Sequence, residues 1–341
     1  MPSLPVLQSH VPVPPELTPA QRHHAARELA NAVRGEVRFD RHNRLLYATD
    51  ASLYQVEPLG VVIPDDIDDA VAAVAFCAGR SLPILPRGGG TSLAGQCTNR
   101  AVVIDFSARC NRLLNADPTL GTCRVEPGIT IDDLNDELSR GPAKDWFFAP
   151  DPATSRHCNV GGAIGNNAAG ARSIRYGRTS ESLLGVDVML ADGSRCQFDE
   201  GAALRDPAVH ALTRRVADVV LPLASEIRAR FPKTVRRNAG YALDMILDGI
   251  EKDPAGLSRV NLAHLVCGSE GTLAVTLGAH LRLHPKPRAK GLSVLGFSDL
   301  DEAIAAVLPI LATGPSAVEL LDDMVVGLAA ANAEYRRYVD L

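Results

Sequence analysis

The sequence has few aromatic residues, no excess of positive charge and no long apolar run. Aromatic residues make up 4% of the 341 residues, and the formal net charge is −5. A mildly acidic chain lacks the electrostatic footprint of a nucleic-acid-binding protein, and so few aromatic side chains offer no stacking platform for single strands. No apolar stretch approaches the roughly 18 residues that span a bilayer. The start of the chain also lacks the basic and apolar regions of a signal peptide.

The cysteines form no C-x-x-C pair and no other local cluster. All seven are scattered, at positions 77, 97, 110, 123, 158, 196 and 267. An odd number of scattered cysteines argues against a disulfide framework and against a zinc or iron–sulfur site within this chain. Because free thiols persist in a reducing compartment, the pattern predicts a cytoplasmic protein.

Glycine, by contrast, is concentrated in three clusters. The first, Pro86-Arg87-Gly88-Gly89-Gly90-Thr91-Ser92-Leu93-Ala94-Gly95, stands between two apolar runs at 82–85 and 101–104. Three successive glycines leave backbone N–H groups unshielded, and such a loop can form a nest of donors for phosphate oxygens. Its arginine adds positive charge, and its threonine and serine hydroxyls add donors. We therefore predict a diphosphate-binding loop, the alternative being a glycine-rich hairpin turn.

This loop matches neither of the common phosphate-binding motifs. A Walker A loop ends in Gly-Lys followed by Ser or Thr, and no such ending is present here. A Rossmann fingerprint needs a third glycine at position 93, where this chain has leucine, and a helix directly afterwards. The residues after Gly95 instead predict a polar loop and then a strand.

The second and third clusters combine small residues with polar side chains. The second, at 161–170, reads Gly-Gly-Ala-Ile-Gly-Asn-Asn-Ala-Ala-Gly and follows the rigid turn Pro150-Asp151-Pro152-Ala153-Thr154. The third, Gly268-Ser269-Glu270-Gly271-Thr272-Leu273, opens an apolar run. Small residues let the backbone approach a flat ligand, and asparagine supplies both a donor and an acceptor. One such cluster marks a turn; three in this order indicate a nucleotide site.

In their order and chemistry these motifs resemble the FAD-binding domain of the vanillyl-alcohol oxidase/para-cresol methylhydroxylase (PCMH-type) superfamily. The resemblance covers roughly residues 40–325. It is greatest to the branch of glycolate oxidase subunits, D-lactate dehydrogenases and D-2-hydroxyglutarate dehydrogenases. Further matching motifs are Arg175-Tyr176-Gly177, Leu190-Ala191-Asp192-Gly193, Arg237-Asn238-Ala239-Gly240-Tyr241 and Ala317-Val318-Glu319-Leu320-Leu321-Asp322.

The resemblance implies an α+β fold, with a two-lobed PCMH-type FAD-binding domain followed by the start of an α/β substrate cap domain. We expect an N-terminal arm and helix at 1–35, a first lobe at 36–113, a second lobe at 114–287 and the beginning of the cap at 288–341. Relatives continue well beyond the matching part, with histidine-rich metal motifs and substrate-binding arginines. One strand and two helices do not make a stable domain, so we expect a fragment or a truncated reading frame.

The resemblance also implies a cofactor and its contacts. FAD would bind with its pyrophosphate on the first loop, its flavin and ribityl chain along the second cluster and its adenosine near the third. Relatives that tether the flavin do so through a histidine in the first loop, where this chain has Thr91, so we expect non-covalent FAD. The candidate FAD-binding residues are Pro86, Arg87, Gly88, Gly89, Gly90, Thr91, Ser92, Gly95, Pro150, Asp151, Thr154, Gly161, Gly162, Gly165, Asn166, Asn167, Gly170, Glu270, Gly271 and Val275.

The activity implied by this branch is oxidation of a D-2-hydroxy acid, such as D-lactate, D-2-hydroxyglutarate or glycolate, by hydride transfer to flavin N5. That reaction needs a base for the hydroxyl proton and a cation for the carboxylate. The sequence assigns no catalytic residue, and the cation candidates are Arg172, Arg175, Arg178, Arg236 and Arg237.

The expected partners are the hydroxy acid and an electron acceptor. Two alternatives stay open. One is an FAD-binding module that is inactive by itself because its cap is missing. The other is a NAD-binding or interaction protein that reuses glycine-rich turns.

Tyrosine and histidine candidates have simpler explanations. Tyr176 and Tyr241 would line the flavin face only if they were not used for packing, which is the commoner role. His280 and His284 have the i, i+4 spacing of metal ligands on a helix, but the alternating residues around them predict a strand, so we expect no metal site. His157 fits a turn residue better than a general base.

Local patterns predict the elements around these motifs. Thr18-Pro19-Ala20-Gln21 combines an N-cap, a first-turn proline and a capping-box glutamine, which together begin a helix that ends near residue 33. Residues 1–17, with five prolines, predict an extended arm. Further helices are expected at 65–78, 130–139, 207–230, 299–311 and within 320–341, and strands at 82–85, 101–105, 184–190, 273–283 and 292–297.

Overall fold

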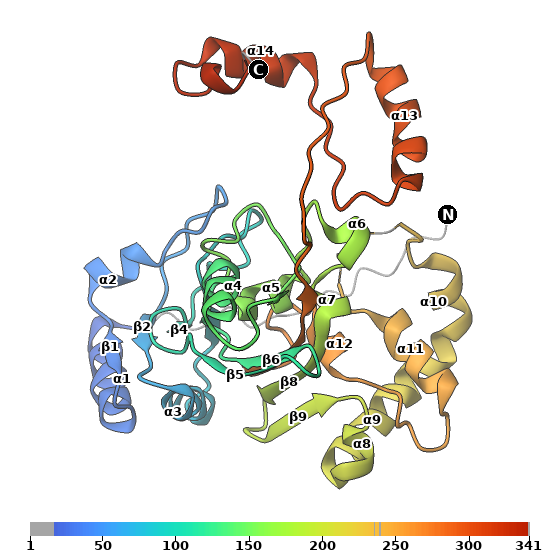
Figure 1. The fold of residues 1–341 in the computed structure, drawn as a ribbon. Helices are drawn as coiled ribbons and strands as arrows, with labels where there is room; N and C mark the ends of the chain where they lie inside the picture. Colours follow the sequence, from blue (N-terminus) through green and yellow to red (C-terminus); the bar gives the residue numbers. More distant parts are fainter. Residues whose placement is uncertain (1–16, 235, 239, 340–341) are drawn as a thin grey trace, which may run out of the picture.

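The computed structural model describes residues 17–234, 236–238 and 240–339 (Figure 1). Two larger β-sheets with their helices form the body of the molecule, and the segment after residue 287 stands away from it. The arm expected at 1–17 lies outside the described residues except for Leu17. None of the described helices is long and apolar enough to cross a membrane.

The first sheet has a parallel centre. Its strand order is β1-β2-β4-β3, in which β2 and β3 both pair with β4 in parallel and β1 pairs with β2 antiparallel. Every residue of β2 and of β4 is buried, as expected for strands covered on both faces. The strands are β1 (Glu36–Arg38), β2 (Gly60–Ile63), β3 (Ile84–Arg87) and β4 (Val102–Asp105).

Three helices pack beside this sheet and complete the first lobe. They are α1 (Pro19–Ala32), α2 (Arg41–Leu46) and α3 (Ile67–Gly79). The predicted capping box begins α1: the Thr18 hydroxyl accepts from the Gln21 N–H, and the Gln21 side chain accepts from the Thr18 N–H. Leu29 of α1 and Ala73 of α3 lie in the same buried cluster as β2 and β4. The predicted helices and strands that flank the first glycine cluster are therefore confirmed, within a few residues at their ends.

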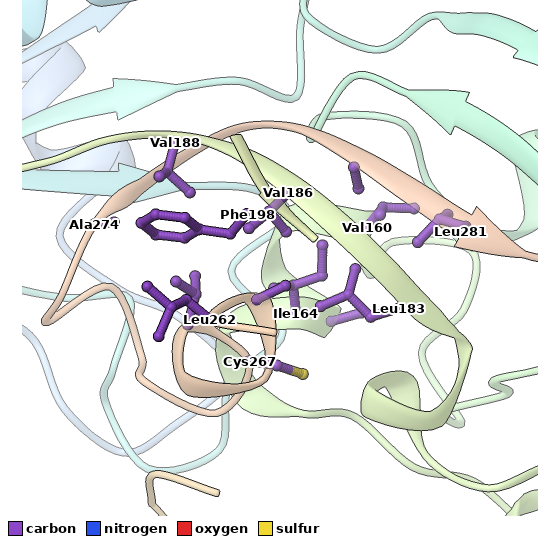
Figure 2. Packing of buried hydrophobic residues seen from close by; sticks show 14 of the residues in the cluster. Val160, Ile164, Leu183, Val186, Val188, Phe198, Leu262, Cys267, Ala274 and Leu281 are labelled. Atoms are coloured by element: carbon purple, nitrogen blue, oxygen red, sulfur yellow. The ribbon is translucent and has the colours of Figure 1, made fainter. Parts of the chain in front are cut away.

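The second sheet is antiparallel throughout, with strand order β5-β6-β10-β8-β9. Its strands are β5 (Leu113–Asp117), β6 (Thr122–Val125), β8 (Leu183–Met189), β9 (Arg195–Asp199) and β10 (Val275–Arg282). Val186, Phe198 and Leu281 from this sheet lie in one buried cluster with Ile164 of α5 (Val160–Asn166) and with Leu262 (Figure 2). This cluster is the core of the second lobe.

The single long helix predicted at 207–230 is wrong. The chain instead forms α9 (Pro207–Val220), the 3₁₀ turn η1 (Leu221–Leu223) and α10 (Ala224–Arg230). Pro222 has no N–H to donate to the helix ladder, which explains the break. The remaining elements of this lobe are α4 (Ile131–Arg140), β7 (Trp146–Phe147), α6 (Ser173–Tyr176), α7 (Thr179–Ser182), α8 (Ala202–Arg205), α11 (Leu243–Lys252), α12 (Ala263–Val266) and β11 (His284–Pro285).

The last segment carries helices but, among its described residues, no strand. The helices are α13 (Leu300–Ala312), α14 (Asp323–Ala331) and the 3₁₀ turn η2 (Arg336–Tyr338). The strand predicted at 292–297 is therefore wrong; Leu292 and Val294 are 91% and 87% exposed. A strand needs a neighbour for its backbone N–H and C=O groups, and no described strand pairs with this stretch.

Candidate functional site

A cavity of about 620 Å³ opens between the two lobes. Its walls come from the loop after β3, from residues 152–168 including α5, and from residues 266–276, which lead into β10. The three glycine clusters, which are far apart in the sequence, meet here. The predicted residues that line the cavity are Pro86, Arg87, Gly88, Gly89, Gly90, Thr91, Ser92, Thr154, Gly161, Gly162, Gly165, Asn166, Glu270 and Gly271.

Other predicted residues lie behind the wall rather than in it. Asn167 caps the end of α5 with a left-handed φ of 52° and accepts a hydrogen bond from the Ser180 N–H at 3.0 Å. Asp151 accepts from Arg172 Nε at 2.8 Å. Val275 is buried in the core of the first lobe. The predicted residues that do not line the cavity are Gly95, Pro150, Asp151, Asn167, Gly170 and Val275.

The glycine loop (residues 86–92) is held in place by a residue of the second lobe. The buried side chain of Asn159 accepts a hydrogen bond from the Gly89 N–H at 2.5 Å and donates from Nδ2 to the Gly128 carbonyl. A Cβ at Gly88 would fall on the Asn159 side chain, and one at Gly89 would fall on the carbonyl oxygen of His157. Glycine is therefore required at both positions for the loop to approach the second lobe this closely.

Arg87 stabilises the same loop from the other side. Its Nη1 donates to the carbonyls of Tyr47 and Cys97 at 3.1 and 2.7 Å, and its Nη2 donates to the carbonyl of Thr49 at 2.7 Å. The guanidinium, which the sequence suggested as a phosphate contact, thus joins three backbone segments of the first lobe. Its charge still lies at the cavity wall, because Arg87 is one of the lining residues.

The third cluster packs against α5 of the second. Backbone N–H groups of Gly268 and Glu270 donate to the carbonyls of Ile164 and Gly165 at 2.8 and 2.9 Å. Gly268 has φ 88°, a left-handed conformation that glycine adopts without strain. Glu270 Oε1 accepts from Asn166 Nδ2 at 3.0 Å across the cavity wall. Partial burial raises the pKa of Glu270, and this hydrogen bond offsets the rise only in part.

Residues 58–199 match the sequence model of a family described as an FAD binding domain. The match runs from just before β2 to the end of β9. Over 84% of the chain it is 31% identical to the D-2-hydroxyglutarate dehydrogenase of Escherichia coli K12, of which it covers 28%. It is 29% identical to the glycolate oxidase subunit GlcD of Bacillus subtilis, over 85% of the chain and 52% of that protein. The chain therefore spans between about a quarter and a half of these relatives.

A solved structure of alkyldihydroxyacetonephosphate synthase shares the fold. It superposes with a TM-score of 0.61 at 19% identity, and the match covers 93% of this chain and 50% of that one. The resemblance drawn from the glycine clusters is confirmed by these relatives, as is the α+β, PCMH-type fold.

The residues of the cavity wall suit FAD, a ligand with an anionic centre and a flat end. A Cβ at Gly162 or at Gly271, both in the wall, would meet no atom within 4 Å, so a side chain there would enter open space. The N–H groups of Gly90 and Thr91 have no acceptor among the described residues. Free amides on a glycine loop are the donors that phosphate oxygens need.

None of the five candidate arginines lines this cavity. Arg172 pairs with Asp151, and Arg237 pairs with Asp244. Arg178 is 4% exposed, pairs with Glu181 and donates to the Arg237 carbonyl. The other two donate to backbone: Arg236 to the Gly170 carbonyl at 3.3 Å and Arg175 to the Gly314 carbonyl at 3.0 Å. Three of these guanidinium groups are thus neutralised within the FAD-binding lobes.

The tyrosine and histidine candidates serve mostly in packing. Tyr176 makes edge-to-face contacts with Phe147 and His284, at ring-centre distances of 5.4 and 5.0 Å. His280 lies in β10 and His284 in β11, so both lie in strands rather than on a helix, as the alternating pattern predicts. His157 lies in a turn, as predicted. No group of three or more potential metal ligands is present among the described residues.

Sequence reasoning missed Asn159, the residue that joins the glycine loop to the second lobe. Its position just before α5 is that of an N-cap, yet its side chain makes no capping hydrogen bond, because it is turned toward Gly89 and Gly128. The sequence carries one signal of this: position 162, three residues after Asn159, holds glycine instead of the Glu or Gln of a capping box. Tyr241, for which packing is the commoner role, is 41% exposed, and its hydroxyl lies 2.8 Å from that of Thr272, a lining residue.

Proposed function

We propose that this chain is the FAD-binding part of a flavin-dependent oxidoreductase that oxidises a D-2-hydroxy acid. The observation that carries the proposal is the meeting of three glycine clusters around one cavity, the first two of them inside the residues that match an FAD binding domain. Relatives named for D-2-hydroxyglutarate and glycolate support the substrate class. We place the protein in the cytoplasm, where its seven free thiols would stay reduced.

In this proposal the glycine loop holds the FAD pyrophosphate through backbone amides. Gly90 and Thr91 offer free N–H groups, whereas the Gly89 N–H is already used by Asn159. The backbone at Gly161, Gly162 and Gly165 would lie along the flavin and ribityl chain, and residues 270–271 near the adenosine. With threonine at position 91, the loop offers no histidine for a covalent bond, so the flavin would be held by non-covalent contacts alone.

When bound, FAD would supply the electron sink that accepts a hydride at N5. The described residues would bind and orient the cofactor and exclude water from one side of it. The arginines that the sequence suggested for the substrate carboxylate do not line the cavity. We therefore assign to this chain the binding of the cofactor, and leave the catalytic base and the anchoring cation unassigned.

The runner-up is an FAD-binding module that is inactive by itself. The observation that favours it is that none of the five candidate arginines for the substrate carboxylate lines the cavity. A NAD-binding or interaction protein is disfavoured by the match to an FAD binding domain.

One purification separates these functions. We expect a yellow protein whose flavin is released by acid and that is bleached anaerobically by D-lactate, D-2-hydroxyglutarate or glycolate. Acid-released flavin with no bleaching by any of the three would favour the inactive module. A colourless protein that takes up no FAD on reconstitution would refute both flavin functions. If the bleached flavin regains its colour when oxygen or an artificial acceptor is added, the protein turns over. The same re-oxidation gives a first assay for the natural acceptor.

A further inference from the structure

A second groove, of about 700 Å³, lies on the first lobe between α1, the end of β1 and α2. No residue of this groove lines the FAD cavity. Ala26, Val37 and Phe39 form an apolar wall, and three arginines, Arg22, Arg41 and Arg44, project from two helices. Guanidinium groups bind carboxylate and phosphate, so this combination suits a ligand with an anionic head and an apolar body.

The two acidic residues of the groove are already engaged. Asp40 caps α2, accepting from the N–H and the Nδ2 of Asn43 at 3.0 and 2.7 Å. Glu57 pairs with Arg44 at 2.5 Å. Arg44 is 9% exposed and also donates from Nε to the Pro58 carbonyl at 2.9 Å. Glu57 therefore neutralises Arg44, while Asp40 keeps its charge and its oxygens accept from Asn43. Three arginines against two carboxylates leave the groove with a net positive charge.

Arg22 and Arg41 have no carboxylate partner among the described residues. Arg22 donates from Nη2 to the Leu17 carbonyl at 3.2 Å. Its Nε, however, is buried and has no hydrogen-bond partner among the described residues. A buried N–H of a charged group costs free energy when it is left without an acceptor. Burial lowers the pKa of Arg44, and the neighbouring charge of Arg22 lowers it further.

We propose that this groove binds a small organic anion, whose carboxylate or phosphate is held by Arg22 and Arg41 and whose apolar part lies against Val37 and Phe39. Such an anion would supply the acceptor that Arg22 Nε lacks and would offset the repulsion between the arginines. The planar guanidinium group binds both carboxylate and phosphate through paired hydrogen bonds. The site therefore requires a ligand with a negative charge and an apolar body, and accepts either head group. The inference does not rest on the proposed function, because no groove residue contributes to the FAD cavity.

The test titrates the FAD-loaded protein, in which the glycine loop is occupied, with phenyl phosphate, benzoate, inorganic phosphate and phenol. We expect phenyl phosphate or benzoate to bind at least tenfold more tightly than phosphate or phenol alone. The stronger of the two identifies the preferred head group. Arg22→Gln and Arg41→Gln should each weaken that binding tenfold or more, and Arg27→Gln, an exposed change on α1 outside the groove, should leave it unchanged.

A second measurement covers the case in which a variant alters the fold. In buffer whose only anion is chloride, Arg22→Met should raise the melting temperature, because it removes a charged group whose buried Nε lacks an acceptor. Phenyl phosphate should raise the melting temperature of the natural protein and not that of Arg22→Met. Equal affinities, within twofold, for the natural protein, Arg22→Gln and Arg41→Gln would overturn the proposal, as would a ligand-induced shift of the same size in Arg22→Met.

Discussion

The side-chain oxygen of Asn159 lies 2.5 Å from the backbone nitrogen of Gly89, and this hydrogen bond joins the glycine loop of the first lobe to the second lobe. The same side chain donates to the Gly128 carbonyl, so one buried amide fixes the distance between the loop and the start of α5. The position of the free amides of Gly90 and Thr91 depends on it. Asn159 thus positions the groups that we propose for the FAD pyrophosphate.

Replacement of this asparagine should weaken FAD binding beyond its effect on stability. Asn159→Leu leaves the Gly89 N–H and the Gly128 carbonyl without partners, which should cost about 2 kcal/mol of unfolding free energy. In the protein that remains folded, we expect the dissociation constant for FAD to rise at least tenfold, measured by flavin fluorescence.

The matched control is Asn261→Leu. Asn261 is also buried and also bridges two backbone groups, accepting from the Ala263 N–H and donating to the Leu184 carbonyl, but it does not line the cavity. It should cost similar stability and leave FAD affinity unchanged. Equal loss of FAD affinity in both variants would show that Asn159 acts only through general stability.

Replacement of Gly162 should abolish FAD binding while the fold is retained. It lies in α5 and lines the cavity, and a Cβ there would meet no atom within 4 Å. Gly162→Leu should keep or raise stability by up to about 1 kcal/mol, because leucine favours a helix over glycine, while its side chain fills the space of the cofactor. We expect at least a hundredfold loss of FAD affinity by titration calorimetry.

Gly79→Leu is the control for this change. Gly79 ends α3, is exposed, has open space around its Cβ and lies away from the cavity. It should bind FAD as the natural protein does. Retention of stoichiometric FAD by Gly162→Leu would contradict the placement of the cofactor along α5.

The elements that the sequence predicted well are those whose determinants are local. The Thr18–Gln21 capping box and the glycine content of the loop after β3 need only a few neighbouring residues. Contacts between distant segments could not be predicted: Asn159 and Gly89 are 70 positions apart, and the guanidinium of Arg87 binds the carbonyl of Thr49, 38 positions away. The strand expected at 292–297 failed for the same reason, since pairing depends on a partner that the residues of the strand do not specify.

Glu270 should make stability depend on pH in a predictable direction. Its pKa is raised in the folded protein by partial burial at the cavity wall, so the folded state binds the proton more tightly than the unfolded state. Stability should therefore rise as pH falls from neutrality through the raised pKa toward the ordinary value of a glutamate. Urea unfolding of the FAD-free protein at several pH values between 4.5 and 7 measures this slope.

Glu270→Gln should remove that contribution, because glutamine does not titrate, while it keeps the hydrogen bond with Asn166 by turning its amide. The difference in unfolding free energy between the two proteins should then shrink or change sign as the pH is lowered. A difference that stays constant across this range would show that Glu270 titrates as an ordinary surface carboxyl.

Arg178 is expected to stabilise the second lobe rather than to bind substrate. Its side chain is buried, pairs with Glu181 and donates to the Arg237 carbonyl, so Arg178→Met leaves a partly buried carboxylate unpaired and should cost about 3 kcal/mol of unfolding free energy. The double variant Arg178→Met/Glu181→Gln should recover part of this loss, because it removes the unpaired charge. Urea unfolding measures both, and Arg175→Gln, an exposed change whose partner is one carbonyl, should fall within about 0.5 kcal/mol of the natural protein. If Arg178→Met kept its stability and instead lost only the anaerobic bleaching by hydroxy acids, the buried arginine would be a substrate anchor after all, since a structural ion pair has no reason to spare the fold and affect the substrate alone.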